Sequence, residues 1–272
     1  MRYLRLGTII ILVVVLFFAG QTIVQDLRSD KTPPIIYEDQ GPLHISVKDD
    51  PSAMLAGLTA TDDRDGDVTE NIRIERISRF GDDGSLDVSF VVFDKANNMC
   101  RHIRTVFYDD YQSPRFTLTQ PLVYYIGQTV AVMDRLKLND NLSGDITHKV
   151  KLEASNVNNG QVGQYEVSLT AVTDYGDEVY ARLPINIQKY DALAPVIQLS
   201  DYLVYTKVGE PIHPKDYITE IKDCNGFPID VNVVFAFSQV DFSKPGGGQF
   251  RLEVNDGDGR TGYTYLSVIV EE

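Results

Sequence analysis

Four aspartates stand close together and form the densest carboxylate cluster of the chain: Asp62, Asp63, Asp65 and Asp67. Clusters of carboxylates can hold Ca²⁺, which takes about six to eight oxygen ligands. The run does not follow the helix–loop–helix calcium pattern, because Val68 occupies the position that requires glycine when the count starts at Asp63. The alternative is a tight turn in which aspartate side chains accept hydrogen bonds from backbone N–H groups. The sequence leaves both a calcium site and a structural turn open.

Tyrosine is the second residue type that could form a binding surface, since the chain contains 15 tyrosines and no tryptophan. The candidates are Tyr124, Tyr125, Tyr202 and Tyr205. Aromatic side chains can form platforms for sugar rings, and tyrosine is enriched in protein–protein interfaces. Tyrosine in an alternating strand also packs half in the core and half at its rim. Glycan binding, protein binding and packing are therefore all open as roles for these four residues.

Charge and motif content argue against several function classes. Lys and Arg together number 25 against 39 Asp and Glu, which gives a formal net charge of −14. So acidic a surface repels phosphate backbones, and we expect no binding of DNA or RNA. The sequence has no G-x-S-x-G or H-E-x-x-H run, and its four histidines share no short spacing. We therefore expect neither an enzyme nor a zinc centre.

A repeat organises most of the chain, because Pro33, Pro114 and Pro195 follow one another at intervals of 81 residues. Each repeat continues with an acidic turn, an alternating strand that begins at a glycine, and a final alternating strand. No stretch after Val24 keeps the 3.6-residue apolar period of a helix, and short alternating strands between turns indicate β-sandwiches. We predict an all-β chain with three tandem domains at residues 33–111, 112–191 and 192–272.

Two motifs of the first repeat form a known pattern: the acidic turn from Ala60 to Asp67 and the hairpin from Asp94 to Asn98. With the proline-led first strand, they resemble bacterial immunoglobulin-like surface domains, which occur in tandem on secreted enzymes, adhesins and some insecticidal crystal toxins. The later repeats keep less of the pattern, and the third is the most divergent. The resemblance implies immunoglobulin-like sandwiches used for extracellular binding or spacing, and it does not imply an enzyme.

The N-terminus carries an uncharged run of about 19 residues from Leu6 to Val24, close to the roughly 20 residues that cross a bilayer. Arg2 and Arg5 precede the run, which predicts a cytoplasmic N-terminus and an extracellular remainder. A cleaved signal peptide is the alternative, although cutting after either small residue near the end of the run places a phenylalanine at −3. The predicted segments are a cytoplasmic N-terminus at 1–5, a transmembrane signal anchor at 6–25 and a stalk at 26–32.

Together these observations predict a membrane-anchored, non-catalytic extracellular protein of three immunoglobulin-like β-sandwiches after one N-terminal transmembrane helix. It would act in adhesion, as a spacer, or as the external subunit of a cell-surface complex. Its expected partners are the membrane, through the N-terminal helix, and a protein at the cell surface, with a glycan as the other option. The alternative function is an accessory module or enzyme that acts on a cell-wall polymer or glycan. Calcium is the one ion that the sequence suggests.

Overall fold

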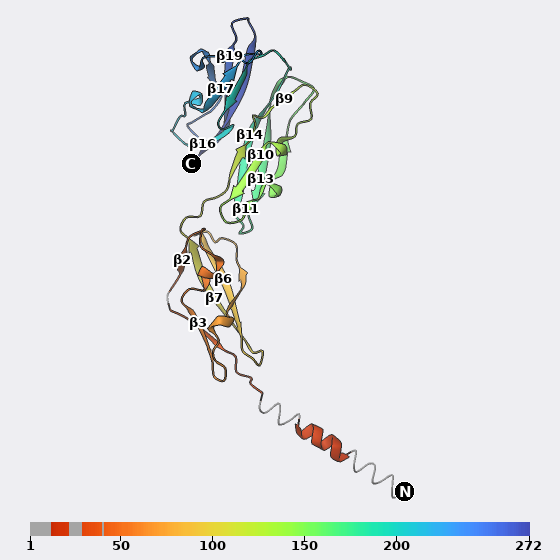
Figure 1. Ribbon diagram of the computed structural model, residues 1–272, viewed down its shortest axis with the longest axis vertical. Helices are drawn as coiled ribbons and strands as arrows, with labels where there is room; N and C mark the ends of the chain where they lie inside the picture. The colour runs from red at the N-terminus through yellow and green to blue at the C-terminus, as the bar shows by residue number, and fades with distance from the viewer. Residues whose placement is uncertain (1–11, 22–28, 40) are drawn as a thin grey trace, which may run out of the picture. The chain divides into compact units, whose positions relative to one another are not determined.

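The computed structural model describes residues 12–21, 29–39 and 41–272. The chain divides into two compact units, the first ending at Asp110 and the second beginning at Tyr111. The predicted all-β architecture of three repeated sandwiches is confirmed. Six sheets form three pairs, one pair in the first unit and two in the second (Figure 1).

The N-terminal region contributes one short helix at residues 12–21. Within the described ranges, no helix combines the length and the apolar content that a membrane crossing requires. Parts of the predicted anchor at 6–25 and of the predicted stalk at 26–32 lie outside the described residues, as does the whole predicted cytoplasmic segment at 1–5.

The first sandwich packs a three-stranded sheet against a four-stranded sheet. The three-stranded sheet has the order β1 (Ile35–Glu38), β3 (Leu58–Asp62), β4 (Gly66–Asp67). The four-stranded sheet has the order β2 (Leu43–Ile45), β7 (Met99–Tyr108), β6 (Ser85–Phe93), β5 (Arg73–Ile77). Alternation along β6 shows how the core forms, because Leu86, Val88, Phe90 and Val92 are all fully buried on one face.

The second sandwich repeats this plan. Its three-stranded sheet has the order β11 (Gly144–Asp145), β10 (Leu136–Asp140), β8 (Arg115–Leu118). Its four-stranded sheet has the order β12 (Lys151–Ser155), β13 (Gly163–Val172), β14 (Glu178–Gln188), β9 (Val123–Tyr125).

The third sandwich is the most reduced, since its small sheet keeps two strands. These are β15 (Val196–Leu199) and β17 (Ile218–Lys222). The large sheet has the order β16 (Leu203–Lys207), β20 (Thr261–Glu271), β19 (Gly246–Asn255), β18 (Phe235–Ser238).

One topological feature recurs in all three sandwiches. The second strand (β2, β9 or β16) leaves the sheet of the first strand and pairs in parallel with the last strand of the other sheet. The opening segment of each repeat therefore contributes to both sheets. Short 3₁₀ helices complete the connections: η1 (Pro51–Leu55), η2 (Thr69–Asn71), η3 (Val132–Asp134), η4 (Thr147–Lys149), η5 (Pro214–Tyr217) and η6 (Val231–Val233).

The second and third sandwiches are joined by direct packing within the second unit. Leu203 of β16 belongs to the core of the second sandwich, and Tyr202 packs against the cores of both. Strand β19 also comes so close to β14 that a Cβ added to Gly247 would lie 1.9 Å from the carbonyl oxygen of Arg182. Only glycine fits at that point of the joint.

A buried pair of amides lies in the same joint. Asn186 Nδ2 donates to Gln249 Oε1 at 2.8 Å, and Gln249 Nε2 donates back to Asn186 Oδ1 at 3.1 Å. Both residues are buried, at 6% and 1% exposure. Because buried amides are stable when their donors and acceptors are paired, these two side chains fix how the sandwiches meet.

Candidate functional site

The structure buries Tyr124 and leaves Tyr125, Tyr202 and Tyr205 partly buried. Tyr124 is 1% exposed, burial raises its pKa, and the guanidinium of Arg135 lies 4.0 Å from its ring centroid. Tyr205 accepts a hydrogen bond from the backbone N–H of Phe116 at 2.8 Å, and burial raises its pKa as well. Tyr124 and Tyr205 therefore belong to the interior, as the packing interpretation expects.

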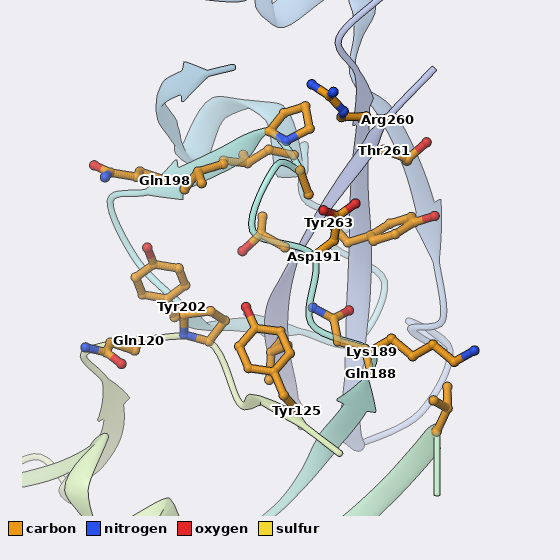
Figure 2. A pocket seen from close by; sticks show the side chains of 18 of the residues that line it. Gln120, Tyr125, Gln188, Lys189, Asp191, Gln198, Tyr202, Arg260, Thr261 and Tyr263 are labelled. Carbon is orange, nitrogen blue, oxygen red and sulfur yellow. The ribbon is translucent and has the colours of Figure 1, made fainter. Parts of the chain in front are cut away.

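Tyr125 and Tyr202 instead line a groove between the second and third sandwiches (Figure 2). The groove has a volume of about 950 Å³, and Tyr263 of β20 supplies a third tyrosine to its wall. The ring of Tyr125 meets the ring of Tyr190 edge to face, with centroids 4.8 Å apart. Sequence alternation alone could not separate the two tyrosines that line the groove from the other two, because it gives no information on the joint.

The groove wall is mixed, with aliphatic residues and prolines beside tyrosines and polar side chains. Three glutamines contribute amide groups: Gln120, Gln188 and Gln198. Its charged residues are Arg135, Lys189, Arg260 and Asp191, so cationic side chains outnumber the carboxylate. In a chain with a formal net charge of −14, this excess of positive groups is local. The groove therefore suits a polar, extended ligand that carries negative charge.

A second surface feature adjoins the groove, on the outer face of β18, β19 and β20. One row of cross-strand neighbours consists of Phe235 on β18, Glu253 on β19 and Tyr263 on β20. In the next row, Phe237 on β18 lies opposite Arg251 on β19. The aromatic side chains are exposed at 63% for Phe235, 46% for Phe237 and 41% for Tyr263. The Arg251 guanidinium lies 4.8 Å from the ring centroid of Phe237 and 5.4 Å from that of Tyr263. We call these five residues the outer aromatic face.

Sequence reasoning missed the outer aromatic face, because alternating apolar residues in a strand were interpreted as core. In the run VFAFS, the large side chains of Phe235 and Phe237 alternate with the small side chain of Ala236. In the structure all four residues of β18 are exposed, Ala236 included, so this alternation does not mark a buried face of β18. The buried face lies on the neighbouring strand β19, where Leu252, opposite Ala236, is fully buried.

The acidic turn of the first sandwich separates the four candidate metal ligands. Asp62 is 8% exposed, and its Oδ1 accepts hydrogen bonds from the backbone N–H groups of Arg64 and Asp65. Asp67 accepts from the Thr69 N–H at 2.9 Å, and hydrogen bonding by Thr69 lowers its pKa. These contacts are those of a structural turn.

The remaining two acids of the turn also stand apart from Asp62. Asp65 accepts from the backbone N–H of Lys95 at 2.7 Å, which lowers its pKa, and its carboxylate lies 3.2 Å from the Lys95 ammonium. Asp63 is exposed. Among the described residues, the acids whose oxygens converge are Asp62 with Asp30 and Asp94, and Asp63, Asp65 and Asp67 are not part of that group.

No family model matches the chain. A curated relative is the pesticidal crystal protein Cry22Aa of Bacillus thuringiensis, which is 31% identical over 130 residues. The chain carries tandem bacterial immunoglobulin-like domains. The alignment covers 46% of this chain and 17% of the crystal protein, so the chain spans a small part of that relative's length. The similarity therefore concerns a part of the crystal protein, and the activity of the whole relative is a separate matter.

Solved structures with similar folds include bacterial and animal proteins. One is the CBM51-2 and INT domain structure of ZmpB from Clostridium perfringens, with 14% identity over 54% of this chain and 26% of that chain, at a TM-score of 0.23. Another is N-cadherin EC1-3 of Drosophila, with 13% identity over 86% of this chain and 98% of that chain, at a TM-score of 0.31. These TM-scores are too low to support a conclusion about the immunoglobulin-like domains of this chain.

Proposed function

We propose that the chain is a non-catalytic binding protein of the cell exterior that docks another protein through its third immunoglobulin-like domain. The observation that carries the proposal is the outer aromatic face, where two phenylalanines and a tyrosine stand exposed around Arg251. Aromatic residues and arginine are enriched in protein–protein interfaces, and contiguous exposed apolar patches mark them. Tyr263 belongs to both the face and the groove, so one partner can contact both.

The groove supports a particular kind of partner segment. Lys189 and Arg260 are among the residues that line it, and the tyrosines provide flat contact area with few rotatable bonds. An extended acidic segment of the partner would therefore enter the groove, while the outer aromatic face holds the partner's apolar surface. Loss of the cationic groups would affect salt dependence first, since exposed charges are screened by salt.

The lining of the groove supports a non-catalytic role. Its residues include one carboxylate, that of Asp191, and no histidine, serine or cysteine among the described residues. Glycoside hydrolysis ordinarily uses a pair of carboxyl groups, and nucleophilic catalysis requires a nucleophile next to a base. A single carboxylate among amides, tyrosines and cations meets neither requirement.

The location of the protein is a proposal from the N-terminal sequence. The uncharged run from Leu6 to Val24, preceded by Arg2 and Arg5, supports a signal anchor with the immunoglobulin-like domains outside the cell. Protease treatment of intact cells tests this proposal. We expect the domains to be digested without lysis and the chain to resist extraction from membranes by carbonate; protection of the domains in intact cells would contradict it.

The docking proposal is tested by crosslinking in intact cells, followed by affinity purification and mass spectrometry. We expect one membrane or secreted protein in near-equal amount with the chain. The double variant Phe235→Ser, Phe237→Ser should lose that protein. The matched control is Ile103→Ser, which removes an apolar side chain of 61% exposure from the first sandwich and should retain it. Recovery of the bare chain, or a partner retained by the double variant, would contradict the proposal.

A second candidate function is glycan binding in the groove, and one observation favours it. Tyr125, Tyr202 and Tyr263 line a cavity that also presents three glutamine amides, which can pair with sugar hydroxyls. Glycan arrays separate the two functions. If a glycan is the ligand, Tyr125→Ala should abolish binding while the double phenylalanine variant leaves it intact.

A further inference from the structure

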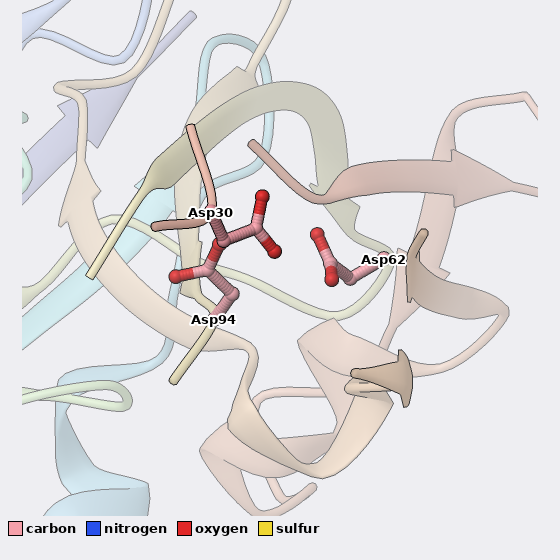
Figure 3. Close-up of side chains that lie close together, drawn as sticks. All are labelled: Asp30, Asp62 and Asp94. Carbon is pink, nitrogen blue, oxygen red and sulfur yellow. The ribbon is translucent and has the colours of Figure 1, made fainter. Parts of the chain in front are cut away.

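Three aspartates from separate segments of the first unit meet at one point. Asp30 precedes β1, Asp62 ends β3 and Asp94 follows β6. One carboxylate oxygen from each lies within 4.8 Å of the other two (Figure 3). Asp30 falls in the segment that the sequence assigned to a stalk, yet its backbone oxygen accepts from Asn98 Nδ2 at 3.2 Å. The segment that contains Asp30 is therefore attached to the end of the first sandwich where Asp62 and Asp94 lie.

The carboxylate of Asp62 has one oxygen that nothing in the described chain satisfies. Asp62 is 92% buried, because its exposure is 8%. Its Oδ1 accepts two backbone N–H groups, whereas its Oδ2 is buried and has no hydrogen-bond partner among the described residues. Figure 3 shows this carboxylate facing Asp30 and Asp94. A buried anionic oxygen without a donor is costly, which points to a ligand that the oxygen would bind.

The corresponding turn of the second sandwich shows what satisfies the carboxylate when no ligand is needed. Asp140 occupies the position of Asp62, and its two oxygens accept one N–H each, from Leu142 and Ser143. In the first sandwich both backbone N–H groups donate to Oδ1 of Asp62, and Oδ2 faces Asp30 and Asp94 without a donor (Figure 3). The turns differ in how the carboxylate is used, although their sequences align.

The first repeat also has more acidic side chains at this site than the other two repeats have at theirs. Thr173 takes the place of Asp94 in the second sandwich, because its Oγ1 accepts the Asp177 N–H as Asp94 Oδ1 accepts the Asn98 N–H. In the third sandwich, Arg260 lies 4.0 Å from Asp256. The first sandwich adds a third acid, Asp30, where the 81-residue period places Tyr111 and Ala192 in the other repeats. The guanidinium of Arg64 lies 3.7 Å from Asp30, and the side chain of Arg64 is 53% exposed. Three carboxylates thus gather where Asp30 has one half-exposed arginine beside it.

We propose that Asp30, Asp62 and Asp94 bind one divalent cation, Ca²⁺, at the end of the first sandwich. Because no two of the three oxygens are more than 4.8 Å apart, some point lies within about 2.8 Å of all three, and Ca²⁺–oxygen distances are about 2.3–2.6 Å. A closure of a few tenths of an ångström completes the site, with water as the remaining ligands. Ca²⁺ tolerates this irregular arrangement better than Mg²⁺, which demands near-octahedral geometry.

The cation would tie the segment before β1 to the turns after β3 and β6. Asp94 is already held by the Asn98 N–H and Nδ2, at 2.7 and 2.6 Å, so its carboxylate is fixed before the ion arrives. Asp30 is the ligand that the ion would recruit, since it is the least buried of the three. Binding would therefore stabilise the first unit, and it would leave the second unit unchanged.

Calcium titration of the purified full chain by isothermal calorimetry tests the proposal, after chelator treatment. We expect one Ca²⁺ per chain, and roughly a tenfold or greater loss of affinity in Asp30→Asn and in Asp62→Asn because each removes one of three charged ligands. Asp65→Asn, in the same turn, and Asp140→Asn, in the second sandwich, are the matched controls and should bind as the parent chain does.

Melting curves supply an independent readout that a merely structural role would not move. Millimolar Ca²⁺ should raise the melting temperature of the parent chain by mass action, and should raise that of Asp30→Asn much less. In chelator, Asp30→Asn should melt at the same temperature as the parent or higher, because repulsion among the acids is relieved. Absence of binding to the parent chain, or binding that Asp65→Asn abolishes and Asp30→Asn preserves, would overturn the proposal.

Discussion

The amide pair of Asn186 and Gln249 offers a direct test of the joint between the second and third sandwiches. Replacing Asn186 with Ala removes two hydrogen bonds and leaves the Gln249 Oε1 without its donor in a side chain that is 1% exposed. Each unsatisfied buried polar group costs about 1–3 kcal/mol, and each lost neutral hydrogen bond about 0.5–1.5 kcal/mol. The expected loss of unfolding free energy for Asn186→Ala is about 2–3 kcal/mol.

A double-mutant cycle isolates the interaction across the joint. The variant Asn186→Ala, Gln249→Ala leaves no stranded amide, so it should cost about 1–2 kcal/mol less than the sum of the single variants. Gln239→Ala is the control, because Gln239 is exposed and accepts from Gln249 Nε2 within the third sandwich at 2.8 Å. That variant leaves the pair across the joint intact and should cost less than about 1 kcal/mol.

Urea denaturation of the full chain measures the free energy of unfolding. Hydrogen exchange of the backbone amides in β14 and β19 reports on the second unit separately from the first sandwich. We expect both strands to lose protection together in Asn186→Ala, since the pair lies between them. A cost below about 0.5 kcal/mol for Asn186→Ala, or single-variant costs that simply add, would refute the conclusion that these amides couple the two sandwiches.

Three further predictions concern the close approach at Gly247, the hydrogen bond of Tyr205 and the hydrogen bonds of Asp241. Gly247→Ala places a Cβ 1.9 Å from the Arg182 carbonyl oxygen and should destabilise the second unit in thermal melts while the first keeps its transition. Tyr205→Phe removes an acceptor of a buried N–H and should cost about 1–2 kcal/mol by urea denaturation; an unchanged midpoint contradicts this. Asp241 should titrate at about 2 by NMR, because hydrogen bonds from Ser243 lower its pKa from 3.8. The stabilisation of the folded chain by ionised Asp241 is therefore complete above about pH 4 and is lost as the pH falls toward 2. Ser243→Ala should raise the pH midpoint of the Asp241 titration.

The fold could be predicted from the sequence to a large extent. The 81-residue period and the glycine-led alternating runs correspond to real strands: the run beginning at Gly84 contains β6, and the run beginning at Gly163 contains β13. Such predictions succeed because alternation follows directly from strand geometry, and every repeat uses the same turns. What alternation leaves open is the outward face of a strand at a sheet edge, which is why Phe235 and Phe237 were missed.

The sites could be predicted less well, because they depend on contacts between distant segments. The acidic turn drew attention to Asp62 through its neighbours Asp63, Asp65 and Asp67, yet the structure groups it with Asp30 and Asp94. Spacing along one turn cannot report which acids converge from three segments. The tyrosines show the same limit, since full burial of Tyr124 and partial burial of Tyr125 depend on how β9 pairs with β14.

Site-specific photocrosslinking in intact cells tests the central claim, that the third sandwich docks a protein partner. A photoreactive phenylalanine analogue replaces Phe237, Tyr263 or, as the control, Ile103 of the first sandwich, all three being exposed. We expect positions 237 and 263 to crosslink to the same protein in comparable yield and position 103 not to do so. Crosslinking to that protein at 103 with none at 237 and 263, or no adduct at any position, would contradict it.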